Sequence, residues 1–152
     1  MTELFNTYLA MLQAVLPSAQ WVLGFIDGEG CFHVAIQKNN TLRCGYQVQL
    51  QFCITQHIQD RELMDQLILF FGVGTVNSDG PLKVQYRIRG MDDLEYHLFP
   101  FLEKNPLLTK KRLDYEQFRA VHALMRKGLH LTPEGLAQIR LIKGLMNRSR
   151  VK

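Results

Sequence analysis

The spacing of the apolar residues changes several times along this chain, and each change defines the type of element. Trp21, Val22, Phe25 and Ile26 have helical spacing, Ser18 can cap the helix start, and glycines follow at its end. Apolar and polar residues then alternate over residues 31–37 and 45–54, and again over 73–78 and 82–89. This alternation is typical of strands, and the turn-like stretches at 38–41 and 78–80 predict two hairpins.

Helices are predicted in the remaining segments. Asp60 marks the start of a helix over 61–71 that ends at Gly72, and another helix begins near Asp92 and stops before Pro100. Thr109 can cap a long helix to Lys127, and Thr132 a last helix to Asn147. The order α-ββ-α-ββ-α, with two C-terminal helices, predicts an α+β domain: one antiparallel sheet with helices on one face and the other face open.

Length and composition fit one domain. We expect residues 1–17 to form an amphipathic helix or arm and residues 18–152 a single domain. No apolar run is long enough to span a membrane, so no membrane contact is expected. No Lys or Arg precedes Lys38, so no signal or transit peptide is predicted. If the protein works inside an organelle, we expect it to be made there.

The three cysteines, Cys31, Cys44 and Cys53, form no CxxC pair, which argues against a zinc site or a disulfide framework. Cys31 and Cys53 lie in apolar strand patterns and are expected to be small core residues.

The net charge is +4, and all 18 basic residues follow position 37. A modest basic excess is common in soluble proteins and only weakly favours a polyanionic partner.

Two predicted strands carry polar side chains on one face without any acid. The apolar residues between them would pack on the helices. A solvated sheet face is the alternative, but Gln and Arg make paired hydrogen bonds to purine edges, and Lys and Arg bind phosphates. The pattern therefore favours nucleic-acid binding by Gln47, Gln49, Gln51, Lys83, Gln85, Arg87 and Arg89.

The segment 22–30, VLGFIDGEG, resembles the LAGLIDADG motif, with Leu23 in place of a small residue. The likeness extends to residues 52–56 and to residues 106–115, and so covers most of the chain. The chain resembles the LAGLIDADG homing endonucleases, most nearly the fungal mitochondrial type encoded in group I introns. The resemblance implies a saddle-shaped sheet and a site-specific, metal-dependent double-strand DNA endonuclease.

Site residues follow from the same resemblance. It implies that Glu29 binds the metal together with the backbone carbonyl of Gly28, while Asp27 is structural. Gln56 and Lys111 match positions that order water and charge, with Lys110 as the alternative to Lys111. Solvated surface roles are the alternatives for Glu29, Gln56 and Lys111. The expected cofactor is Mg²⁺, or Mn²⁺, with Ca²⁺ as a substitute that does not support cleavage. His33 and Gln37, with Ala35, are expected on the face turned toward DNA.

One motif supplies one acid, so the working form is expected to be a homodimer on a long palindromic or near-palindromic DNA site. Gly24 and Gly28 would form the dimer interface, because helices cross closely where side chains are small. An isolated half of a two-domain enzyme, or a chain that needs a different partner, is the alternative. A non-cleaving maturase or DNA- or RNA-binding protein of the same fold is the main rival function. The target sequence is open.

Overall fold

The computed structural model describes residues 2–147, with the side chains of residues 10–15 outside that description. Residues 148–152, which the sequence assigns to the domain, also lie outside it. Four antiparallel strands form one sheet in the order β1-β2-β4-β3. The strands are β1 (Gly30–Lys38), β2 (Tyr46–His57), β3 (Thr75–Ser78) and β4 (Lys83–Arg89). The structure confirms both predicted hairpins, although β2 runs three residues beyond its predicted end at residue 54.

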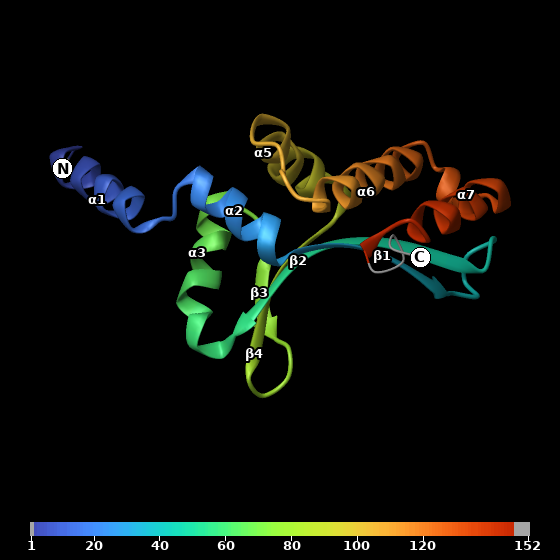
Figure 1. Ribbon diagram of the computed structural model, residues 1–152, viewed down its shortest axis with the longest axis horizontal. Helices are drawn as coiled ribbons and strands as arrows, with labels where there is room; N and C mark the ends of the chain where they lie inside the picture. Colours follow the sequence, from blue (N-terminus) through green and yellow to red (C-terminus); the bar gives the residue numbers. More distant parts are fainter. Residues whose placement is uncertain (1, 148–152) are drawn as a thin grey trace.

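Helices cover one face of this sheet (Figure 1). They are α2 (Ala19–Glu29), α3 (Arg61–Phe71), α4 (Met91–Asp93), α5 (Phe99–Lys104), α6 (Lys111–Arg126) and α7 (Pro133–Lys143). Short 3₁₀ turns, η1 (Ile58–Asp60) and η3 (Leu129–Leu131), precede α3 and α7. Helix α1 (Thr2–Val15) projects from the body beside the start of α2, with Leu4, Phe5 and Tyr8 exposed.

The core lies between these helices and the apolar face of the sheet. Phe32 of β1, Phe52 of β2 and Phe118 of α6 are fully buried, and the ring of Phe32 lies 5.2 Å from that of Phe52 and 5.3 Å from that of Phe118. Burying a side chain of this size contributes about 1.5–3 kcal/mol relative to leaving it exposed. The alternate strand residues are therefore held on the opposite, open face.

The predicted helix stop before Pro100 is wrong. The chain stays helical from Met91 to Lys104 through a π-helical segment, η2 (Leu94–Leu98). The N–H of Phe99 donates to the carbonyl of Leu94, five residues back, so the hydrogen-bond pattern is shifted where Pro100 follows. Pro100 then stands in the first turn of α5, where a missing N–H costs little.

Helix ends match the sequence to different degrees. Ser18 caps α2 by accepting from the N–H of Trp21, and Thr132 caps α7 by accepting from Gly135. Asp60 precedes α3 but makes no cap hydrogen bond with its side chain, because it belongs to the turn η1. Gly72 ends α3 as predicted, whereas α7 ends at Lys143 and does not reach Asn147.

Candidate functional site

Glu29 stands where α2 joins the sheet without a loop. Val22 and Ile26 lie on one face of α2 and are completely buried. Gly30 begins β1 directly after Glu29. A Cβ on Gly30 would lie 2.8 Å from the carbonyl oxygen of Ile26 and 3.2 Å from the Phe52 ring, so only glycine fits this close approach. The junction delivers the exposed Glu29 to the edge of the sheet.

An open groove of about 1120 Å³ lies beside Glu29 along the edge strand β1. Gly28, Glu29, Cys31, Lys111 and Asp114 are among its lining residues. Partial burial lowers the pKa of Lys111, while the charges of Cys31, Asp27, Glu29 and Asp114 oppose that shift. Lys111 therefore lies at the site with Glu29, whereas the exposed Lys110 does not line the groove.

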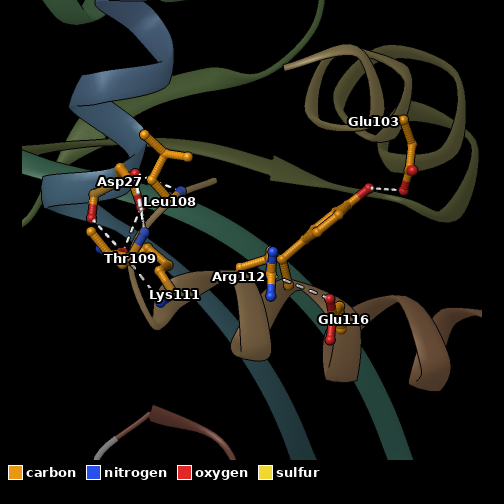
Figure 2. A network of polar contacts seen from close by, with 8 residues as sticks. Asp27, Glu103, Leu108, Thr109, Lys111, Arg112 and Glu116 are labelled. Carbon is orange, nitrogen blue, oxygen red and sulfur yellow. Dashed lines mark hydrogen bonds and ion pairs between the residues drawn. The ribbon is translucent and has the colours of Figure 1, made fainter. Parts of the chain in front are cut away.

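Asp27 joins α2 to the segment that leads into α6 (Figure 2). Its carboxylate accepts from the backbone N–H groups of Leu108, at 2.9 Å, and Thr109, at 3.1 Å, and from the Thr109 hydroxyl at 2.5 Å. The Thr109 hydroxyl in turn accepts from the N–H of Lys111 at 3.2 Å. Asp27 thus fixes the start of α6, and with it Lys111, relative to Glu29.

These contacts also set the pKa of Asp27. Partial burial would raise it, but the hydrogen bonds from Thr109 and Leu108, together with the charge of Lys111, outweigh burial and lower the pKa. Both oxygens already accept hydrogen bonds from this segment. The geometry therefore supports a structural role for Asp27.

The structure does not bring Gln56 to this groove. In β2, Gln56 has the same parity as the buried Phe52 and Ile54, and its register partner on β4 is the buried Val84. Gln56 thus faces the same side of the sheet as these core residues, and it is not among the residues that line the groove. A catalytic role for Gln56 stays a prediction without support from the geometry.

Cys53 is buried, as predicted, but Cys31 is not a core residue. The alternation of β1 turns Cys31 away from the helices, and its half-buried side chain lines the groove. The two cysteines are register partners. A hydrogen bond from Cys53 lowers the pKa of Cys31 to about 7, and the charge of Lys111 acts in the same direction against burial.

The open face of the sheet carries the polar residues that the sequence grouped. The register pairs His33 with Gln51 and Gln37 with Gln47 across β1 and β2, and Gln51 with Arg89 across β2 and β4. No acid occurs at the strand positions of this face, where the polar and charged residues are His33, Gln37, Gln47, Gln49, Gln51, Thr55, His57, Thr75, Asn77, Lys83, Gln85, Arg87 and Arg89.

Two of these residues are already held in place. Gln85 donates to the hydroxyl of Thr55 at 3.0 Å, and Gln47 accepts from Asn39 at 3.1 Å. In contrast, the Nε of Arg87 is buried with no hydrogen-bond partner among the described residues. A buried donor without a partner is uncommon in folded proteins.

Sequence reasoning missed the cations that α7 adds to the groove. Arg140 and Lys143 line it with His33, and the guanidinium of Arg140 lies 4.7 Å from the centre of the Tyr46 ring. Burial and the charge of Lys143 lower the pKa of His33. No local sequence signal could find this group, because it depends on how α7 docks against β1.

Gly24 and Gly28 lie on the exposed side of α2. Among the described residues, nothing lies within 4 Å of a Cβ placed at either position. The backbone therefore permits larger residues at both positions as far as the described residues of this chain are concerned.

The described residues also contain no group of three or more His, Cys, Asp or Glu side chains that could hold a metal ion. One chain thus offers Glu29 and nearby backbone carbonyls, which is part of an oxygen ligand set.

A helix that ends in an acid at the edge of a four-stranded sheet, above an open face of amides and cations, defines a LAGLIDADG-type domain. The model of the family described as LAGLIDADG endonuclease matches residues 22–122. The chain belongs to this family of homing DNA endonucleases, which are metal-dependent phosphodiester hydrolases.

Similar proteins and solved structures support the same family assignment. The chain is 38% identical, over 94% of its length, to the probable intron-encoded endonuclease 3 of Neurospora crassa. The homing endonuclease I-TnaI superposes with a TM-score of 0.84 at 41% identity, covering 88% of this chain and 90% of that one. I-SmaMI bound to cleaved DNA superposes with a TM-score of 0.85 at 34% identity, covering 88% of this chain and 45% of that one.

The share of each relative that is matched differs. The chain spans 26% of the Neurospora crassa relative, less than half of I-SmaMI and most of I-TnaI. The match to the family model and the superposition on I-TnaI establish the family and the α+β fold for this chain. Within residues 2–147, no helix combines the length and apolar character needed to cross a membrane.

Proposed function

We propose that this chain is a site-specific endonuclease that cuts both strands of a long palindromic or near-palindromic DNA site as a homodimer. Each protomer contributes Glu29 as a metal ligand, with the carbonyl of Gly28 beside it. The observation that carries this proposal is the groove in which Glu29 and Lys111 meet, at the edge of an acid-free open face.

The donor set fits a hard divalent cation. Carboxylate and carbonyl oxygens are the ligands that Mg²⁺ and Mn²⁺ prefer, and Gly28 and Glu29 offer both at the end of α2. A second Glu29, from another protomer, would complete a site that one chain only begins. When bound, the metal supplies charge neutralisation and an activated water for phosphodiester hydrolysis.

The chain's own residues would prepare the reaction. The Glu29 carboxylate is exposed and so is accessible to a metal ion. Lys111 places a positive charge near the negative charge that develops on a cleaved phosphate. Asp27 keeps α6 and Lys111 in place through the loop at 108–109.

DNA would lie against the open face of the sheet. The amides and guanidiniums there match base edges, and the cations of β4 match phosphates. A solved structure of I-SmaMI holds an uncleaved DNA target in the presence of calcium ions. By analogy, we expect Ca²⁺ to support DNA binding by this chain without cleavage.

The proposal of a homodimer rests on α2. The glycine side of α2 is uncovered by the residues that the structure describes, and the match over 90% of I-TnaI shows that a chain of similar length occurs among homing endonucleases. The fungal relatives named as intron-encoded endonucleases support a place of action in the organelle of synthesis, which we take to be the mitochondrion.

Cleavage of DNA libraries tests the proposal. Purified protein should cut selected duplexes with Mg²⁺ or Mn²⁺ and only bind them with Ca²⁺. Glu29→Gln should bind the same duplexes and leave them intact, because a neutral amide of equal size is a poor metal ligand. Specific binding without cutting by the parent protein, under all three metals, would instead favour the non-cleaving maturase or nucleic-acid-binding role.

A further inference from the structure

Two cysteines face each other across neighbouring strands next to Glu29. Cys31 of β1 is the register partner of Cys53 of β2, so their side chains project from the same face of the sheet. Opposite residues in an antiparallel pair have Cα atoms about 4.5–5.5 Å apart, within the range of about 4.4–6.8 Å that a disulfide spans. A bond between the two sulfurs therefore requires only a small local shift of the strands.

The two thiols differ in access. Cys31 is half-buried and lines the groove with Glu29 and Lys111. Cys53 is only 7% exposed, and the register places Arg87 on its other side. A reagent that enters the groove meets Cys31 first, whereas Cys53 is placed to react with Cys31. This is the arrangement of an attacking thiol with a resolving thiol.

The groove also selects the kind of reagent. Its lining carries three cations, Lys111, Arg140 and Lys143, against the two acids Glu29 and Asp114, so the excess of positive charge favours a small anionic molecule. The third cysteine, Cys44, lies in the loop at the far end of the β1–β2 hairpin, where its thiol contacts the carbonyl of Tyr46 at 3.1 Å. Cys44 is therefore a natural internal control.

We propose that Cys31 and Cys53 form a thiol modification site for small anionic disulfides such as oxidised glutathione, and that its oxidation blocks the groove. The deprotonated sulfur of Cys31 attacks one sulfur of the small disulfide, which forms a mixed disulfide and releases one thiolate. The sulfur of Cys53, after losing its proton, attacks the Cys31 sulfur and releases the second thiolate. Two protein thiols are oxidised, one small disulfide is reduced to two thiols, and these take up the protons.

Either product changes the site. A glutathione adduct on Cys31 occupies the groove beside Glu29. The protein disulfide draws β1 toward β2 at Cys31, the residue after Gly30. Gly30 packs closely on Ile26 and Phe52, and this packing fixes the position of Glu29. The thiol chemistry does not depend on the proposed function, and only the expected loss of cleavage rests on it.

Mass spectrometry of the full-length protein tests the chemistry. Reduced protein treated with oxidised glutathione should lose the mass of two hydrogens and retain no adduct, peptide mapping should find Cys31 linked to Cys53, and dithiothreitol should reverse the change. Cys44→Ser should respond like the parent. Cys53→Ser should stop at a glutathione adduct on Cys31, and Cys31→Ser should form neither product.

Cleavage assays on the same samples test the consequence. The parent and Cys44→Ser should lose cleavage on oxidation and regain it on reduction. An unchanged mass or a bond to Cys44 overturns the thiol site, and a stable adduct on the parent overturns the resolving role of Cys53. A Cys31–Cys53 disulfide with undiminished cleavage overturns its effect on the groove. If the reduced protein never cuts DNA, the result counts against the proposed function. The conclusion about the thiol site, which rests on mass spectrometry, is then unaffected.

Discussion

Asp27 and Glu29 are both acids at the end of α2, but their surroundings assign them different roles. The Asp27 carboxylate accepts three hydrogen bonds from Leu108 and Thr109, whereas none of the hydrogen bonds of the described residues involves the exposed Glu29 side chain. Asp27→Asn would place an amide NH₂ against backbone donors. We expect a loss of about 1–3 kcal/mol in the free energy of unfolding, measured by urea denaturation.

Glu29→Gln is the matched control for this prediction. It should leave the unfolding midpoint where it is in the parent and remove cleavage only. Equal loss of stability in the two variants would show that Asp27 does not anchor α6 in the way the hydrogen bonds indicate.

Arg87 and Gln49 provide a test of base recognition on the open face. Arg87 has a buried donor without a partner, and Gln49 is exposed on β2. Changing either to Ala should relax preference at particular base pairs by about 1–3 kcal/mol, measured by binding to single-substitution duplexes. Lys104→Ala, at the exposed end of α5, should leave the preference unchanged. If both face variants discriminate among duplexes as the parent does, the open face does not recognise the bases.

At the scale of the element, regular patterns were predictable and tertiary exceptions were not. The alternation in β2 and β4 gave the strands and their polar face, because period two follows from strand geometry. The helix through Pro100 was missed because the π-helical segment before it depends on packing. Gln56 does not line the groove and its role stays a prediction, because a motif match carries no strand parity. Arg140 was missed because α7 docks from far along the chain.

The connection from α3 to β3 gives a stability test. Gly74 has φ of +103°, and a Cβ there would lie 2.6 Å from the Tyr86 ring, which is fully buried and donates to the Val73 carbonyl at 2.7 Å. Gly74→Ala combines strain with a clash against a ring that cannot move aside. We expect it to lower the free energy of unfolding by about 1–3 kcal/mol. Gly144→Ala is the control and should unfold near the parent's midpoint, because Gly144 has a φ of −63° and a Cβ there would come no closer than 3.4 Å to another atom of the described residues.

For the whole molecule, the question is what covers the glycine side of α2. Gly24 and Gly28 lie four apart on one helix face, where nothing in the described chain approaches a Cβ. Such a strip gains stability only when another helix packs on it closely, and with one motif per chain a second copy related by a two-fold axis is the natural cover. The same axis would bring two Glu29 carboxylates together and match a palindromic DNA site.

Gly24→Leu should therefore separate the two protomers without unfolding either one. Because the position is open within residues 2–147, the monomer should still be folded and unfold cooperatively, while sedimentation should show loss of the dimer and gels should show loss of cleavage. Ala137→Leu, a similar enlargement at an exposed position of α7, should retain both dimer and activity. A parent protein that stays monomeric on its DNA at working concentration and still cuts both strands is incompatible with a shared site built from two Glu29 residues.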